Sequence, residues 1–130
     1  MKTKEEIVEI YIKLAANTET LSMSESTFNS IKNLMKMKPP KNAPFHIGKI
    51  GVYDIYEEDN PEDEFTITTY FTRDKDGIFL SFRDDGYRVN ALRRTAGVLE
   101  LSYFFAVSLR PQQLQVDADL VKLIDSWLQK

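Results

Sequence analysis

The chain has 130 residues, of which 42% are hydrophobic and 28% are charged, with a formal net charge of -3 and no cysteine. This length suits one domain, residues 1–130, and the composition excludes a disordered or fibrous chain. The lack of cysteine excludes disulfides, thiolate metal ligands and cysteine nucleophiles. No apolar run approaches the ~20 residues of a membrane-spanning helix, and the first residues lack the apolar core of a signal peptide. We therefore expect a cytoplasmic protein that does not bind membranes.

Two helices are predicted at the N-terminal end. A hydroxyl residue followed three positions later by glutamate is the signature of a capping box. It occurs as Thr3 with Glu6 and as Ser22 with Glu25. Apolar residues at helical spacing follow both, ending at Leu14 in the first case and at Met35 in the second, before KPPKNAP stops the helix. Residues 1–38 are thus expected to form a helical part, with lysines in the last turn of the second helix.

After Pro44 the pattern becomes extended. HIGKIGVYDIYEE predicts one strand, with Gly48 and Gly51 as possible bulge points, and FTITTYFTR and IFLSFR predict two more, joined by a hairpin at DKDG. VLELSYFFAVSL, residues 98–109, alternates large apolar residues between two faces and predicts the longest strand. A buried helix is the alternative there, because a short apolar run fits both. Residues 45–110 are therefore expected to form a sheet.

The most arginine-dense segment is DDGYRVNALRRTAG, residues 84–97. Laid on a helix, Arg93 and Arg94 share the polar side in the last turn, where cations are favoured. If DDG instead turns a hairpin, a shorter helix follows, capped by Asn90. In neither geometry do these two arginines form one patch with Arg88, so the candidate recognition surface is Arg93 with Arg94.

Pro111 ends the last predicted strand, and DADLVKLIDSWLQK predicts a C-terminal helix over residues 116–130. The fold class that follows is α+β. We expect an antiparallel sheet of about four strands, with two N-terminal helices and one C-terminal helix packed on it.

Motifs for catalysis and for metal binding are missing from the sequence. His46 is the one histidine, which makes a zinc site improbable, and EEDNPEDE lacks the turn glycine and closing glutamate of a calcium loop. There is no G-x-S-x-G nucleophile motif, and the glycines are too dispersed for a phosphate-binding loop. We expect no enzymatic activity, no metal and no cofactor.

A block of lysines supports nucleic-acid binding as an alternative. Residues 26–53 contain no acid, and basic side chains interleaved with aromatic ones bind nucleic-acid strands. The net negative charge and the acidic residues 54–85 argue against this function. The candidate nucleic-acid site consists of Phe45 with Lys32, Lys36, Lys38, Lys41 and Lys49, together with Arg93 and Arg94.

Protein binding is the function that the sequence favours. Phe79 alternates with Leu80, and Phe104 lies out of phase with the Leu99 face, so both faces of the sheet carry aromatic side chains. If helices cover one face only, Phe79 and Phe104 are free to dock a protein partner or a second copy in a homodimer. A sheet covered on both faces is the equal alternative.

We therefore predict a non-enzymatic protein-binding module of the adaptor, chaperone or inhibitor type, in which Arg93, Arg94, Phe79 and Phe104 contact the partner. A nucleic-acid-binding protein is the second prediction. The third is a small-ligand-binding or enzymatic α+β domain, whose pocket Tyr53, Tyr70 and Tyr103 would line.

Overall fold

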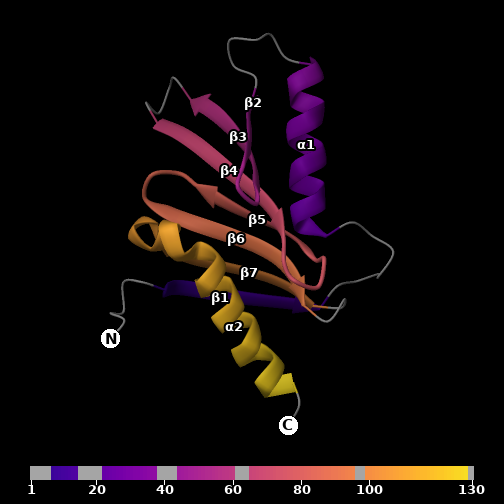
Figure 1. The fold of residues 1–130 in the computed structure, drawn as a ribbon, viewed down its shortest axis with the longest axis vertical. Coiled ribbons are helices and arrows are strands. Elements are labelled where there is room, and N and C mark those ends of the chain that lie inside the picture. Colours follow the sequence, from indigo (N-terminus) through magenta and orange to yellow (C-terminus); the bar gives the residue numbers. More distant parts are fainter. Residues whose placement is uncertain (1–6, 15–21, 38–43, 61–64, 96–98, 129–130) are drawn as a thin grey trace.

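A computed structural model describes residues 7–14, 22–37, 44–60, 65–95 and 99–128. Within these ranges one antiparallel sheet has the strand order β1-β7-β6-β5-β4-β3-β2 and carries two α-helices (Figure 1). In chain order the elements are β1 (Ile7–Leu14), α1 (Met23–Met37), β2 (Phe45–Ile50), β3 (Tyr53–Asn60), β4 (Phe65–Arg73), β5 (Phe79–Asp84), β6 (Arg88–Thr95), β7 (Leu99–Ala106), the 3-10 helix η1 (Val107–Gln112) and α2 (Gln113–Leu128). The predicted α+β class is confirmed, but the sheet has more strands than the four expected, and there is one N-terminal helix in place of two.

The first predicted helix is wrong, because Ile7–Leu14 forms β1. This strand pairs along its length with β7, from Ile7 opposite Phe105 to Leu14 opposite Leu99. The segment IVEIYIKL is rich in β-branched residues, which favour extended backbone, and it also has apolar residues at every second position. The segment thus fits both the helical and the strand spacing of apolar residues, and pairing with the distant strand β7 favours the strand. Thr3 and Glu6, the predicted cap, lie outside the described residues.

The second predicted helix is confirmed as α1, together with its capping box. The backbone N–H of Glu25 donates to Ser22 Oγ, and the N–H of Ser22 donates to Glu25 Oε1, both at 3.1 Å. Lys36 lies in the last turn, as expected. These reciprocal bonds satisfy donors that a helix start would otherwise leave without partners, which explains why the sequence signal was reliable here.

The single strand predicted for residues 46–58 is two strands joined by a tight turn. Gly51 has a φ of 61°, a left-handed conformation that glycine adopts without steric cost, and the chain reverses so that Ile50 lies opposite Tyr53. The bulge expected near Gly48 is present, because the pairing register with β3 shifts between His46 and Gly48. Gly51 is therefore a hairpin residue and the prediction of one strand here is wrong.

The later elements follow the sequence more closely. The strands on both sides of DKDG form β4 and β5, and residues 98–109 contain β7 rather than a buried helix. The prediction that this is the longest strand, ended by Pro111, is wrong: β7 ends at Ala106, Pro111 lies inside η1, and β4 is longer among the described strands. DDG does turn a hairpin, with Gly86 at a φ of 92°, but the segment after it is the strand β6 and not a short helix. It is held between β5 and β7 by pairing on both sides. The C-terminal helix α2 begins at Gln113, three residues before the predicted start.

The two helices pack on opposite faces of the sheet. Along β5 the side chains alternate between the two faces of the sheet. Phe82 therefore belongs to the core beneath α2, while Phe79, three residues earlier, packs beneath α1. The core beneath α2 comprises Leu80, Phe82, Val89, Ala91, Leu101, Tyr103 and Phe105, with Val116, Leu120 and Ile124 from the helix. The core beneath α1 comprises Tyr56 and Phe71 with Ile31, and Phe28, Met35 and Phe79 pack against it.

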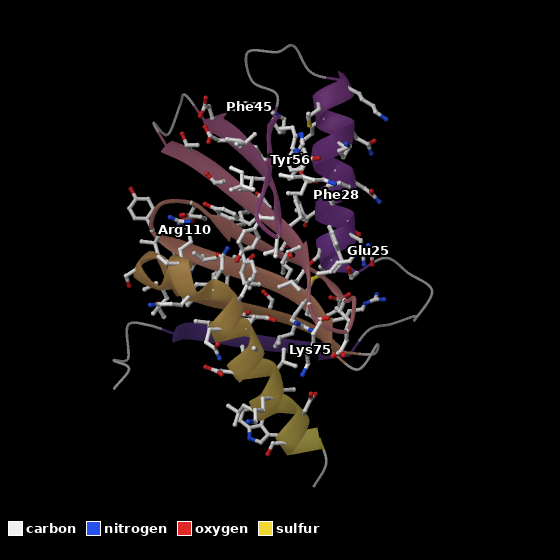
Figure 2. The ribbon with its side chains drawn as sticks, in the orientation of Figure 1. Glu25, Phe28, Phe45, Tyr56, Lys75 and Arg110 are labelled. Atoms are coloured by element: carbon white, nitrogen blue, oxygen red, sulfur yellow. The ribbon has the colours of Figure 1, made fainter. Side chains whose placement is uncertain are left out.

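These cores are offset across the sheet, since α2 packs mainly on β5 to β7, whereas the aromatic contacts of α1 lie on β3 to β5 (Figure 1). The start of α1 also packs on β6, where Ser24 Oγ donates to the Leu92 carbonyl. Figure 2 shows Phe28 reaching from α1 toward Tyr56, and their rings meet edge to face with centroids 5.8 Å from each other. The offset leaves two regions less covered, namely the edge strand β2 and the part of the α1 face formed by β6 and β7.

Candidate functional site

The outer edge of β2 combines an unpaired strand with apolar side chains. The sheet ends at β2, so the backbone groups on its outer side pair with no strand of the described residues. The exposed fractions of Phe45, Ile47, Ile50 and Val52 are 44%, 44%, 59% and 64%. We call these four residues the β2 edge. Single exposed apolar residues are ordinary, but a contiguous group on an open strand is typical of an interaction surface.

The pairing register gives the β2 edge two chemically different sides. Ile50 lies opposite Tyr53, whose ring packs on the α2 side of the sheet. His46 lies opposite Tyr56, on the α1 side, and its imidazole stacks on that ring with centroids 4.6 Å from each other. Lys49 shares this side, because it lies opposite Asp54, two residues before Tyr56. One side of the edge is thus apolar, and the other carries Lys49 and the imidazole of His46, whose Nε2 is hydrogen-bonded to the Asp54 carboxylate.

A second candidate site is a trough on the α1 face. The pairing of β4 to β7 places Thr69, Arg83, Asn90 and Phe104 in one row across four strands. A hollow of about 340 Å³ lies between α1 and this row, and a second of about 270 Å³ lies over Asn90 and Phe104. Arg83 and Asn90 line both hollows, so the two are adjacent. We call them together the arginine trough.

The side chains at the open end of the trough are held in place. The guanidinium carbon of Arg88 lies 4.0 Å from the centre of the Phe104 ring, within the distance of a cation–π contact. The Asn90 amide donates to Ser102 Oγ at 3.2 Å and to the Tyr103 carbonyl at 3.3 Å. Arg83, in contrast, is exposed and forms no ion pair with the described residues. This end of the trough therefore presents two guanidinium groups beside an aromatic ring.

Arg93, a predicted contact residue, lies inside the protein. Its side chain is 2% exposed and forms ion pairs with Asp117 of α2 at 2.6 Å and with Asp74 of the β4–β5 turn at 2.5 Å. The Tyr103 hydroxyl donates to the other oxygen of Asp117 at 2.6 Å. Arg93 thus joins three parts of the fold, and the prediction that it lies on the solvent side of a helix is wrong.

Burial and the neighbouring charges shift the pKa values of Arg93 and its two carboxylate partners. Burial raises the pKa of Asp117, although Arg93 and Tyr103 act in the opposite direction. Burial also acts to raise the pKa of Asp74, but hydrogen bonds from Arg93 and from the N–H groups of Ile78 and Asp76 outweigh it and lower that pKa. The pKa of Arg93 is raised: burial opposes its charge, and the two carboxylates outweigh burial. The arginine therefore remains charged within the core.

Arg94 lies on the other face of the sheet, because neighbouring residues of a strand alternate between faces. Its Nε donates to Glu100 Oε1 at 2.7 Å, and the same oxygen accepts the N–H of Met23 at 3.3 Å, at the start of α1. Arg94 and Glu100 thus hold α1 to the sheet. The proposed surface of Arg93 with Arg94 does not form, since a strand separates two residues that a helix would have brought to one side.

The two predicted aromatic contact residues have different surroundings. Phe79 packs beneath α1, where its ring stacks on Phe71 and meets Phe28 edge to face, so it is not free to dock a partner. Phe104 is half-buried in the arginine trough beneath Arg88. Of the two equal alternatives for the sheet, helices on both faces is the one found, with the cover incomplete at the trough.

Of the lysines in the predicted nucleic-acid site, Lys32 and Lys49 share the α1 side of the sheet within the described ranges, and the other members that can be placed do not join them. Lys32 Nζ lies over the rings of Phe28 and Tyr56, at 5.6 and 6.0 Å from their centres. Lys49 is on the α1 side of β2, whereas Phe45, opposite Glu57, is on the α2 side. Lys38 and Lys41 lie outside the described residues, and Lys36 is at the end of α1. A continuous basic platform is not assembled from the members that can be placed.

The three tyrosines proposed to line a pocket are all on the α2 side. Tyr53 and Tyr70 meet edge to face with centroids 5.4 Å from each other, and Tyr103 is fully buried beneath α2. The Tyr103 hydroxyl is used by Asp117. Tyr103 is therefore a core residue, unable to contact a ligand without movement of the helix.

Most residues of the β2 edge and of the arginine trough are not among the site residues predicted from the sequence. The sequence prediction places Ile47, Ile50 and Val52 inside one long strand, whereas the turn at Gly51 places them at or near an exposed hairpin tip. Arg83 and Arg88 come together only through the register of β5 and β6, which places Arg83 opposite Asn90. No local pattern reveals that register.

Comparison with known proteins adds no identity: no protein-family model, curated protein or solved structure matches this chain. The helices within the described ranges are too short or too polar to cross a bilayer. In the same residues no group of three or more His, Asp or Glu side chains is arranged to hold a metal ion. The geometry of the surfaces must therefore carry any functional conclusion.

Replacing Arg93 should destabilise the protein strongly. Arg93→Met leaves Asp117 and Asp74 without their cation in or near the core, and removing one partner of a buried ion pair costs about 3–5 kcal/mol. Urea denaturation should show this loss in the free energy of unfolding. Arg73→Met is the matched control, because Arg73 is exposed and should contribute below about 1 kcal/mol. Equal stability of the two variants would contradict the structural role of Arg93.

The stability of the protein should fall at alkaline pH because of Tyr103. Burial, together with the nearby charge of Asp117, raises the pKa of Tyr103 well above 10, so the unfolded chain ionises first and the free energy of unfolding decreases above about pH 10. Tyr103→Phe should make this decrease smaller in urea denaturation at a series of alkaline pH values. The pKa values of Tyr53 and Tyr56 are also raised by burial, so part of the decrease should remain. Tyr87→Phe is the control: because Tyr87 is exposed, this variant should show the same decrease of the free energy of unfolding with pH as the wild type.

Proposed function

We propose that this chain is a non-enzymatic protein-binding module, of the adaptor, chaperone or inhibitor type, that docks an extended segment of a partner protein along the β2 edge. The observation that carries the proposal is the coincidence of unpaired strand backbone with the exposed side chains of Phe45, Ile47, Ile50 and Val52. In strand addition the backbone hydrogen bonds provide affinity, and side chains at alternate positions provide specificity.

The two sides of β2 define the chemistry of the docked segment. On the α2 side its residues meet Phe45 and Ile50, and apolar side chains bury the most surface there. On the α1 side they meet His46 and Lys49. A carboxylate at that position pairs with Lys49, and charge complementarity of this kind selects the partner and fixes its register. The segment that fits is therefore extended, with apolar residues alternating with an acidic one.

A second copy of the chain fits this edge less well than another protein. Two β2 strands can pair in an antiparallel way so that the α1 sides of both sheets form one face. Lys49 then lies opposite either Lys49 or His46 of the other copy. The strand FHIGKI contains no carboxylate to accept that charge. Two ammonium groups directly opposite each other destabilise the first of these registers, and in the second Lys49 has an imidazole opposite it and no carboxylate. We therefore assign the edge to a different protein.

A peptide selection tests the proposed docking chemistry. From a random display library of ten-residue peptides, the immobilised full chain should enrich sequences in which apolar residues alternate with Asp or Glu. Synthetic copies of those peptides should perturb the NMR signals of Phe45 to Ile50, and should bind Ile50→Lys at least ten-fold more weakly, because the new cation lies among the apolar contacts.

Leu123→Lys is the matched control for that selection, since Leu123 is also an exposed apolar residue but lies on α2. It should bind the selected peptides as the wild type does. The proposal is wrong if no sequence is enriched, if the enriched sequences are basic, or if Ile50→Lys binds them with unchanged affinity.

The charge on Lys49 should control self-association. Lys49→Glu places a carboxylate opposite His46 of a second copy in the face-matched pair, and should raise the dimer fraction severalfold at equal concentration. Analytical ultracentrifugation measures the fraction. Lys49→Gln removes the cation without adding a carboxylate and should stay monomeric, as should the wild type. A wild-type dimer that Ile50→Lys dissociates would show that the natural occupant is a second copy.

A further inference from the structure

We propose that the arginine trough binds a small organic oxyanion, a phosphate ester or a carboxylate, whose hydroxyl-bearing body extends beneath α1. This site is on a different face and on different strands from the β2 edge, so it stands independently of the docking function. It rests on the placement of Arg83, Arg88 and Asn90, on the charges around them and on the shape of the two adjacent hollows.

Two guanidinium groups converge on the open end of the trough. Arg83 lies opposite Asn90 in the β5–β6 ladder, and Arg88 lies two residues before Asn90 on the same face. Both line the hollow of about 270 Å³. Arg88 is stacked on Phe104 at 4.0 Å, which uses the flat face of the guanidinium and leaves the N–H groups at its edge available. Such edges bind the paired oxygens of phosphates and carboxylates.

The balance of charge at this end is positive. Among the described residues, Asp85 is the one acid that lines this hollow, and Glu58 lines the adjoining one. Its Oδ1 accepts the backbone N–H groups of Tyr87 at 2.9 Å and Arg88 at 3.0 Å, so it is engaged in holding the turn. Asp84, the preceding acid, lies on the α2 face of the sheet, opposite Val89, and pairs there with Arg110 at 3.3 Å, so it does not face the trough. An incoming anion therefore meets two arginines, of which neither forms an ion pair with the described residues.

The part of the trough beside α1 suits the hydroxyl-bearing body of the ligand. Hydroxyl groups of Ser26, Ser30, Thr69 and Ser81 line the hollow of about 340 Å³, together with the Glu58 carboxylate and apolar side chains of α1. Asn90 stands between the two hollows with its N–H groups already used by Ser102 and Tyr103, which leaves its carbonyl oxygen as an acceptor. A ligand with hydroxyl donors next to its anionic group satisfies both parts. Together the hollows reach the size of small-molecule sites.

Titration calorimetry with four probes tests this site on the full chain. Ribose 5-phosphate should bind more tightly than inorganic phosphate, because it fills both hollows, and ribose should not bind. Citrate serves as the carboxylate probe and distinguishes the two kinds of oxyanion: the class that binds more tightly is the ligand class. Absence of heat with all three anions at millimolar concentrations would overturn the proposal.

Variants of the two arginines locate the binding. Arg83→Gln with Arg88→Gln should weaken the binding of the preferred anion at least ten-fold, because both bidentate partners are lost. Arg110→Gln is the control, since Arg110 lies on the other face over Tyr70 (Figure 2) and should leave affinity unchanged. Thermal unfolding verifies that each variant is folded; both trough arginines are exposed, so neither should be needed for the fold. Unchanged affinity of the double variant, or an equal loss in Arg110→Gln, would show that the anion binds elsewhere.

Discussion

The ion pairs of Arg93 are the interaction on which the arrangement of this fold depends. One guanidinium, buried in β6, joins Asp117 of α2 and Asp74 of the turn between β4 and β5. A charge in the core is tolerated only when its partners are placed accurately, so α2 and that turn are constrained to the positions they occupy. α2 lies over β5 to β7, and on the opposite face α1 packs on β3 to β6. The β2 edge lies beyond both helices, and the arginine trough lies beside α1 on its face of the sheet.

Features that depend on neighbouring residues could be predicted from the sequence. The reciprocal cap of Ser22 and Glu25, the DKDG hairpin and the apolar stripe of α2 each lie within a few residues, and their backbone preferences agree with the final structure. The alternation of Phe79 with Leu80 across the sheet is of the same kind. Local sequence and tertiary packing favour the same result at these positions.

Features that depend on distant residues could not be predicted. The segment IVEIYIKL fits both a helix and a strand, and β7, which decides between them, comes much later in the chain. Arg93 is predicted to be a surface residue because charged residues are usually exposed. No residue close to it in the sequence indicates that Asp117 will be its partner. The trough exists only through the registers of β5, β6 and β7. The turn at Gly51, in contrast, could be predicted locally, since a glycine between apolar residues indicates a turn as well as a bulge.

The strand order has a consequence for how the chain is assembled. β1 and β2 are separated in sequence only by α1, yet they lie at the two opposite edges of the sheet. Strands β2 to β7 form a meander in which each pairs with the next, so this part can grow as it is synthesised. β1 pairs only with β7 and must wait for almost the whole chain. Closing so long a loop is slow, which makes β1, although it precedes the other six strands in the sequence, the last of them to enter the sheet.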